Sequence, residues 1–106
     1  MDFVSSSAGE PARVVIVETN PVTAGALSWL LREQGYSVTT ASNRDELFAD
    51  ISRQTPDLIL LDEDVLEQDR AVLGDLRSDD RFHDVRVIVT APLADIEDGA
   101  NGLRDA

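Results

Sequence analysis

Hydrophobic and polar positions follow two different rhythms along the 106-residue chain. Short apolar runs at 58–61 and at 13–17, the second of them β-branched, have the pattern of buried strands, and an alternating segment at 36–41 and a further run at 85–90 also predict strands. In the segments between these runs, apolar residues recur every three or four positions, as they do in helices that cover a sheet. Strands that alternate with helices predict an α/β fold with right-handed crossovers and one parallel sheet.

A helix is predicted after each of the four strands. The first begins at Asn20, a good N-cap that proline follows, and the second begins at Ser42 or Asn43. The third contains the apolar residues beyond the acidic cluster and ends near Arg77 or Ser78. A fourth is predicted over 93–103, and it should be weak because each of its two glycines costs roughly 1 kcal/mol relative to alanine.

Composition and charge exclude several classes of function. A formal net charge of −12 argues against a nucleic-acid or anionic-membrane surface. The chain has no cysteine, and its one histidine, His83, is interpreted as a surface residue, so thiolate or His-rich metal sites are not expected. No segment has the length of a membrane span. We predict a cytoplasmic protein with a flexible leader at 1–12 and one domain over 13–106.

Two further features weigh against a bound nucleotide or similar ligand. The turn at 18–21 contains no glycine, which disfavours a Rossmann or P-loop phosphate site and leaves a small-ligand module as a minor alternative. The only tryptophan, Trp29, lies just beside the apolar stripe of the first predicted helix. We predict that Trp29 has a partly buried packing role and is not a ligand platform.

Three oxygen-bearing side chains follow predicted strands directly: Glu18, Asp62 and Thr90. Because the carboxyl ends of parallel strands meet at one edge, where ligands bind in open α/β sheets, these residues should lie together. Two carboxylates and a hydroxyl suit a hard cation such as Mg²⁺, which could steer a phosphoryl group onto one carboxylate. The alternative is that the acids only accept hydrogen bonds from loop amides or make a loop soluble.

Three segments carry a family resemblance: VVIVETNP (14–21), PDLILLDED (56–64) and LRSDDRFHDVRVIVTA (76–91). Together they resemble the receiver domain of two-component response regulators, from Arg13 to Ala106. The resemblance implies a flavodoxin-like, doubly wound parallel sheet with strand order 2-1-3-4, from which the family's fifth strand and fifth helix are missing. It also implies a phosphorelay signalling domain and not an enzyme.

The resemblance also implies roles for individual residues. Asp62 matches the phosphoacceptor that a histidine kinase or phosphotransfer protein would phosphorylate. An output domain or partner protein would then respond to the phosphorylated form. Glu18, Asp62 and the backbone carbonyl of Asp64 match the Mg²⁺ ligands. Thr90 matches the hydroxyl that contacts the phosphoryl group in the activated state, and Ala91 matches the small residue beside it.

Departures from the family pattern favour a second hypothesis. Thr19 stands where the family has its second metal-binding acid, and the chain has no lysine to match the one in the family's fifth strand. Phosphoryl chemistry should therefore be slow or absent, and Mg²⁺ binding weak or absent. The alternative function is a pseudo-receiver, a protein-interaction module that works without phosphorylation.

The strand at 85–90 is predicted to be an open edge, because no further strand is expected after it. Unpaired backbone groups on an apolar edge strand favour pairing with another chain. We therefore predict a homodimer through this edge, with the alternative that the remainder of a longer protein covers it.

Overall fold

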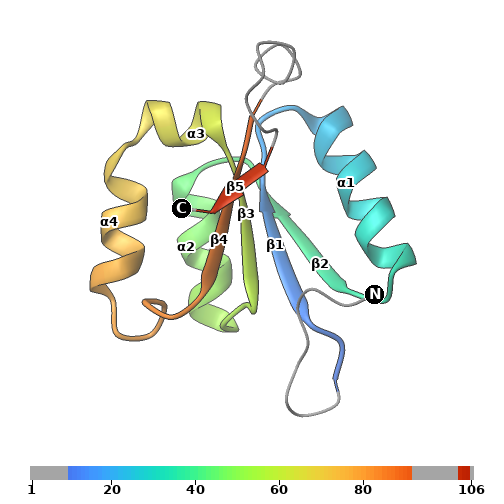
Figure 1. Ribbon diagram of the computed structural model, residues 1–106, viewed down its shortest axis with the longest axis horizontal. Coiled ribbons are helices and arrows are strands. Elements are labelled where there is room, and N and C mark those ends of the chain that lie inside the picture. Colours follow the sequence, from blue (N-terminus) through green and yellow to red (C-terminus); the bar gives the residue numbers. More distant parts are fainter. Residues whose placement is uncertain (1–9, 92–102, 106) are drawn as a thin grey trace.

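The computed structural model describes residues 10–91 and 103–105. Its elements follow one another as strands and helices that alternate over most of the chain (Figure 1). They are β1 (Arg13–Val17), α1 (Pro21–Glu33), β2 (Ser37–Ala41), α2 (Arg44–Arg53), β3 (Leu58–Asp62), α3 (Glu63–Gln68), α4 (Ala71–Ser78), β4 (Arg86–Thr90) and β5 (Leu103–Asp105). None of the helices in this part of the chain is long and apolar enough to cross a membrane.

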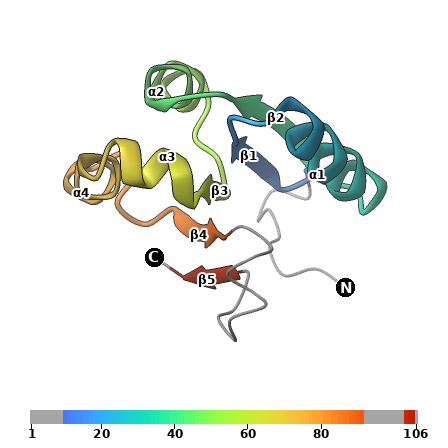
Figure 2. The same ribbon diagram turned by 90° about the horizontal axis from the view of Figure 1, so that it is seen from above.

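The strands form one sheet in the order β2-β1-β3-β4-β5. Strand β1 pairs in parallel with β2 and β3, and β3 pairs in parallel with β4. Helix α1 lies on one face of the sheet, and α2, α3 and α4 lie on the other (Figure 2). The four parallel strands in the order 2-1-3-4 confirm the predicted flavodoxin-like fold.

The core is divided between the two faces of the sheet, because successive residues of a strand point to opposite sides. Val15 and Val17 of β1 belong to the cluster beneath α2 and α4, whereas Val14 and Ile16 belong to the cluster beneath α1. Every residue of β1 and β3 is buried. These two central strands therefore fix the positions of the residues at their carboxyl ends.

Trp29 is outside both clusters, and its side chain is 62% exposed, so the predicted partly buried role is wrong. The face of α1 that meets the sheet contains Ala24, Leu27, Ser28 and Leu31. A residue one step further along a helix is rotated by about 100° from its neighbour, so Trp29 cannot share the direction of Ser28.

Strand β5 corrects the expectations for the end of the chain. It runs antiparallel to β4, with Ile88 paired to Asp105 and Thr90 paired to Leu103. The prediction of an open edge is therefore wrong over Ile88–Thr90, and with it the basis for a homodimer through that edge. The sheet thus has a fifth strand, and β5 is antiparallel to β4, whereas the other four strands are parallel to one another. Leu103 lies in this strand and not in a helix, while 93–102 of the predicted fourth helix lies outside the described residues.

Helix α3 was not anticipated from the sequence. It begins at Glu63, immediately after the last residue of β3, so Asp62 is both a strand end and the N-cap of a helix. Two acids in its first turn, Glu63 and Asp64, interact favourably with the positive end of the helix dipole. The acidic cluster therefore forms the start of a helix and not a simple solvated loop.

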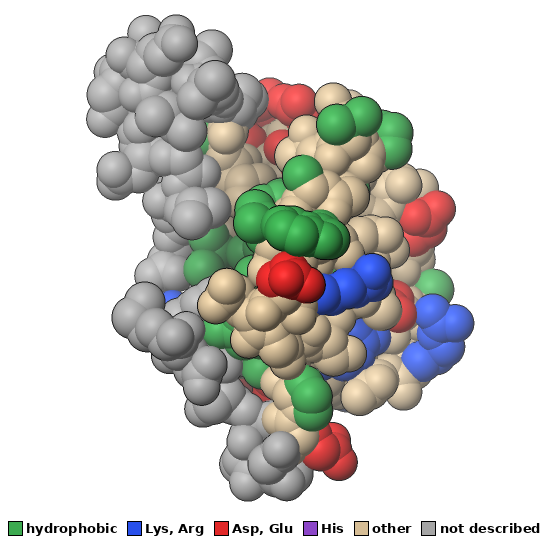
Figure 3. Space-filling view, turned by 90° about the vertical axis from the view of Figure 1, so that its right-hand side faces the viewer, with side chains coloured by type: hydrophobic (Ala, Val, Ile, Leu, Met, Phe, Trp, Pro, Cys, Tyr) green, Lys and Arg blue, Asp and Glu red, His purple; other side chains and the backbone are tan. Residues whose placement is uncertain are grey.

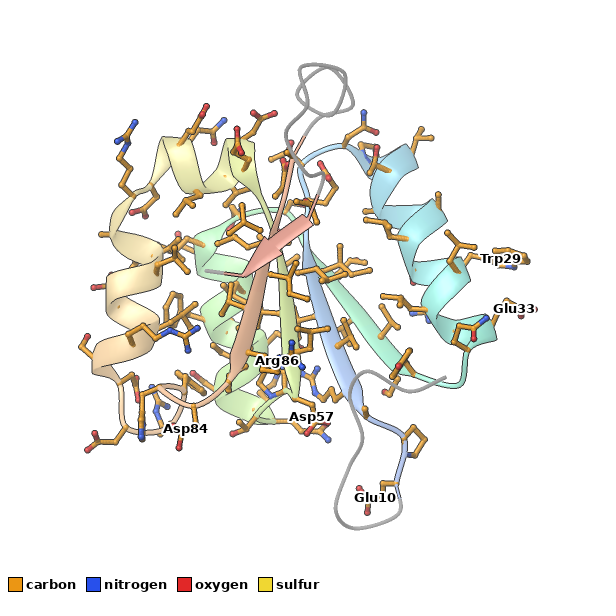
Figure 4. The ribbon with its side chains drawn as sticks, viewed as in Figure 1. Glu10, Trp29, Glu33, Asp57, Asp84 and Arg86 are labelled. Carbon is orange, nitrogen blue, oxygen red and sulfur yellow. The ribbon has the colours of Figure 1, made fainter. Side chains whose placement is uncertain are left out.

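A buried ion pair joins elements at the amino-terminal edge of the sheet. Arg13 Nη2 lies 2.7 Å from Asp50 Oδ2, and the two side chains are only 8% and 13% exposed. Thr39 Oγ1 accepts from Arg13 and donates to Asp50, and the backbone N–H of Arg13 donates to Asp57 Oδ2 at 2.7 Å. Figure 4 shows Asp57 at this lower end of the sheet. The network connects β1, β2, α2 and the turn before β3.

Candidate functional site

Pairing of the central strands brings the predicted site residues to one edge. Val17 pairs with Leu61, so the residues that follow them, Glu18 and Asp62, are neighbours at the carboxyl ends of β1 and β3. Asp62 also pairs with Thr90 at the end of β4. The structure therefore places Glu18, Asp62 and Thr90 together, as the sequence predicts.

Asp62 is the buried acid of this edge, with only 7% of its surface exposed. Desolvation is the main cause that raises its pKa to about 6, and repulsion from the carboxylates of Glu18 and Asp64 adds to the shift. The backbone amide of Asp64 partly opposes this rise by favouring the ionised form. The site therefore holds a carboxylate whose negative charge is poorly balanced by its surroundings.

The turn between β1 and α1 holds Glu18 in place. Glu18 Oε2 accepts a hydrogen bond from the backbone N–H of Asn20 at 3.1 Å. Asn20 in turn caps α1, because its Oδ1 accepts from the N–H groups of Val22 and Thr23 at 2.9 and 3.3 Å. Thr19 lies between them with an exposed side chain that offers a hydroxyl but no carboxylate.

Asp64 occupies an unexpected position for a metal ligand. It belongs to the first turn of α3, and its side chain is exposed. Carbonyl groups of a helix point along the axis towards its carboxyl end, so a position within α3 does not favour metal binding by the Asp64 carbonyl. Within residues 10–91 and 103–105, no group of three or more His, Cys, Asp or Glu residues is placed to hold a metal ion.

The two neighbouring carboxylates nevertheless have the right donor chemistry for a hard divalent cation, which prefers oxygen ligands and would offset their mutual repulsion. The set is poor in charge, because Thr19 offers a hydroxyl and no carboxylate. The residues present therefore fit Mg²⁺ with low affinity.

Thr90 and Ala91 complete the edge on the β4 side. Both are partly buried, and Thr90 lies in the ladder between β3 and β5. A hydroxyl at this position is close in the sheet to Asp62, and the small side chain of Ala91 takes up little space beside it. The role of either residue in contacting a phosphoryl group stays a prediction.

Sequence reasoning missed a groove of about 510 Å³ that begins at Glu18 and Thr19 and runs between α1 and β2. Ser28, Arg32 and Thr40 line its further part, and Arg32 donates to the Val38 carbonyl at 2.9 Å. The lining comes from elements whose proximity depends on how β2 pairs with β1, so no local motif signals it.

Comparisons with known proteins agree on one family. The model of the response regulator receiver domain matches residues 14–104. The Mycobacterium tuberculosis (strain ATCC 25618 / H37Rv) protein named Probable transcriptional regulatory protein TcrX is 37% identical over 78 residues, which are 74% of this chain and 30% of TcrX. The chain therefore belongs to the response regulator receiver domain family, whose setting is two-component signal transduction.

Solved structures support the same assignment. A response regulator from Thermotoga maritima has a TM-score of 0.67 and 26% identity, over 76% of this chain and 66% of that chain. The Mn²⁺-bound form of response regulator Rcp1 has a TM-score of 0.65 and 20% identity over the same shares, which shows the fold alone. The chain corresponds to about a third of the length of TcrX, so it matches one part of that protein.

Proposed function

We propose that this chain is a phosphoacceptor receiver domain in which Asp62 takes a phosphoryl group from the phosphohistidine of a histidine kinase or phosphotransfer protein. The observation that supports this most is the buried Asp62 at the end of β3, beside Glu18 and across from Thr90. A carboxylate with a raised pKa is a better nucleophile than an ordinary aspartate and is still mostly ionised at neutral pH.

In the proposed step, an Asp62 carboxylate oxygen forms a bond to phosphorus while the bond from phosphorus to the donor imidazole breaks. The imidazole leaves with its electron pair and takes up a proton from water, and Asp62 becomes an acyl phosphate. Glu18 and Asp62 would hold Mg²⁺, which would neutralise charge on the phosphoryl oxygens. An oxygen from Asp64 would come from its side chain or from a rearranged first turn of α3. Thr90 would donate its hydroxyl to the phosphoryl group.

Intact-mass spectrometry after incubation with acetyl phosphate tests this proposal. We expect a gain of one phosphoryl group that requires Mg²⁺ and is absent in Asp62→Asn. Asp80→Asn is the matched control, because Asp80 is exposed in the loop between α4 and β4. A gain that persists in Asp62→Asn would contradict the assignment of the acceptor.

The second candidate is a pseudo-receiver that binds protein partners without phosphorylation. The replacement of the second acid by the exposed Thr19 and the commitment of Asp64 to α3 both favour it. Its distinctive expectation is that Mg²⁺ does not bind and acetyl phosphate leaves the mass unchanged.

Thr19→Asp separates the two candidates. If the site is a working but charge-poor acceptor, restoring the acid should strengthen Mg²⁺ binding and speed phosphorylation. Thr19 is exposed, so the substitution should be tolerated by the fold. A Thr19→Asp variant that still neither binds Mg²⁺ nor gains mass would favour the pseudo-receiver.

The wider setting follows from the family. The domain would act in the cytoplasm and undergo one stoichiometric modification without catalytic turnover. An output domain or separate partner protein would read the state of Asp62, since the matched relative TcrX is named a transcriptional regulatory protein. With a net charge of −12, this domain would not itself contact nucleic acid or anionic membrane.

A further inference from the structure

Strand β2 forms one end of the sheet, and its outer side has no neighbouring strand among the described residues (Figure 2). In a parallel pair, one residue bonds to the neighbouring strand through both its N–H and its C=O, and the next residue directs both groups to the opposite side. The N–H of Ser37 and the C=O of Ala41 bond to the β1 side. Val38 and Thr40 therefore direct their backbone groups outwards, away from the sheet.

Side chains cap this outer edge on both sides of Thr40. The guanidinium of Arg32 donates to the Val38 carbonyl at 2.9 Å, and the carboxylate of Glu46 accepts from the Ser42 N–H at 2.7 Å. Within the described part of the chain, the N–H and C=O of Thr40 have no such partner. Unpaired backbone groups on an edge strand favour pairing with another extended backbone.

The groove between α1 and β2 lies beside this open position. Thr40 lines it together with Gly25 and Ser28 of α1, two small residues that leave space next to the strand. A Cβ added at Gly25 would meet no heavy atom within 4 Å. Ser28 is only 6% exposed, yet its hydroxyl makes no hydrogen bond with any described residue. The groove therefore offers both room and a buried polar group that lacks a partner.

The direction of the Thr40 side chain connects the groove with the strand edge. Val38 belongs to the core cluster beneath α1, and Thr40, two residues later, points to the same face of the sheet. Residues directly opposite each other on paired strands also share a face. A segment that paired at Thr40 would therefore direct one side chain into the groove, on the side of Ser28.

The groove has opposite charges at its two ends. Glu18 lines the end where the N–H of Glu18 bonds to Ala41, and Arg32 lines the end where it caps Val38. Figure 3, which looks onto the side of α1, shows that acidic and basic side chains both reach this surface. An antiparallel segment would have its amino-terminal part beside Glu18 and its carboxyl-terminal part beside Arg32. Charge complementarity thus favours a basic residue followed, about four positions later, by an acidic one.

We propose that the outer edge of β2 binds an extended segment of a partner polypeptide, which pairs antiparallel at Thr40 and places one side chain in the groove beside Ser28. Antiparallel pairing is slightly more stable per residue than parallel pairing. A second copy of this chain is disfavoured as the occupant, because each copy carries a net charge of −12. The contact does not use Asp62, so it does not require phosphorylation.

A synthetic peptide with the sequence Thr-Arg-Val-Thr-Val-Asp-Thr, acetylated and amidated at its ends, tests the proposal. Its central threonine would pair with Thr40. Binding to the full chain is followed by the fluorescence of Trp29, the only tryptophan, which lines the groove, and by the NMR shift of the Thr40 amide. The control peptide Thr-Asp-Val-Thr-Val-Arg-Thr has the same composition with the charges exchanged, and it should bind about fivefold more weakly.

Substitutions at Thr40 test the backbone contact. Thr40→Pro removes the outward N–H, and proline is tolerated on an edge strand, so binding should weaken by at least about tenfold while the chain stays folded. Thr40→Val retains both backbone groups and should bind within about twofold of the wild type.

Substitutions of glycine test the groove independently. Gly25→Gln would occupy the groove from α1 and should weaken binding by about tenfold. Gly74→Gln is the matched control, because Gly74 is a glycine of α4 at which an added Cβ also meets no heavy atom within 4 Å, and its binding should be unchanged. Circular dichroism verifies that each variant is folded, and the glycine pair decides the test if Thr40→Pro does not fold.

Four results would overturn the proposal. The first is wild-type chain that does not bind the peptide at millimolar concentration, and the second is binding that persists in Thr40→Pro or in Gly25→Gln. Tighter binding of the control peptide would contradict the antiparallel arrangement. A dimer of the chain alone in sedimentation equilibrium, lost in Thr40→Pro, would assign the edge to a second copy.

Discussion

An aspartate that is largely shielded from water lies at each end of the sheet, and the two aspartates have opposite surroundings. At the amino-terminal edge, Asp50 is paired with Arg13 at 2.7 Å and accepts from Thr39. At the carboxyl-terminal edge, Asp62 lies beside Glu18, and burial and repulsion raise its pKa to about 6. The first edge satisfies its charge within the fold, whereas the second leaves a charge that only a ligand or a proton can balance.

The difference separates residues that stabilise the fold from residues available for chemistry. A buried acid with an arginine partner is a structural element, because removal of one partner leaves an uncompensated charge. A buried acid beside another acid reduces stability, and such destabilised groups are characteristic of functional sites. The following substitutions test whether the two edges behave in these opposite ways.

The largest effect is expected for Arg13→Met. It removes the buried cation beside Asp50 and leaves the Thr39 hydroxyl and Arg53, whose side chain is 77% exposed, as the contacts of this carboxylate. We expect a loss of about 3 kcal/mol in the free energy of unfolding, measured by urea denaturation at neutral pH. A loss below about 1 kcal/mol would mean that the network contributes little.

The opposite sign is expected for Asp62→Asn. The neutral amide removes the repulsion from Glu18 and the desolvated charge, so the variant should be about 1–2 kcal/mol more stable than wild type at neutral pH. Asp80→Asn, in an exposed loop, should change stability by less than about 0.5 kcal/mol. Destabilisation by Asp62→Asn would show that the carboxylate is satisfied in the free protein.

The advantage of Asp62→Asn should depend on pH. The pKa of Asp62 is raised in the folded state, so the native protein binds more protons than the unfolded chain between about pH 4 and pH 6. The contribution of Asp62 to stability is therefore most favourable at low pH and is lost as pH rises through 6. In urea titrations, the gap between variant and wild type should shrink from neutral pH towards pH 4, and a constant gap would contradict the raised pKa.

The smallest effect is expected for Arg53→Ala. Arg53 also contacts Asp50, at 3.1 Å, but from a largely exposed position. We expect a change below about 0.5 kcal/mol in the free energy of unfolding. A loss comparable with that of Arg13→Met would show that exposure does not distinguish the two partners of Asp50.

The sequence predicts the sheet and the meeting of Glu18, Asp62 and Thr90, because in a parallel sheet the position of a residue after a strand determines its edge. It does not predict helix α3, since a six-residue helix has too few turns for a periodic pattern. Strand β5 escapes prediction for a related reason: three residues pair with Ile88–Thr90 only because the rest of the sheet presents that edge.

The charge balance of the site and the exposure of Trp29 also lie beyond local sequence. The pKa of Asp62 depends on burial by elements that are distant in the chain. Helix α1 is apolar on two faces, so periodicity alone cannot decide which face meets the sheet.

The most direct test is the effect of about 10 mM Mg²⁺ on the urea midpoint of the wild type and of Asp62→Asn at neutral pH, with ionic strength matched by NaCl. Because Mg²⁺ would bind only the folded acidic edge, we expect it to stabilise the wild type by roughly 1.4 kcal/mol, for a dissociation constant of about 1 mM, and to leave the variant unchanged. Equal midpoints of the wild type in both salts, or equal stabilisation of both proteins, would contradict a cation-dependent site at Asp62.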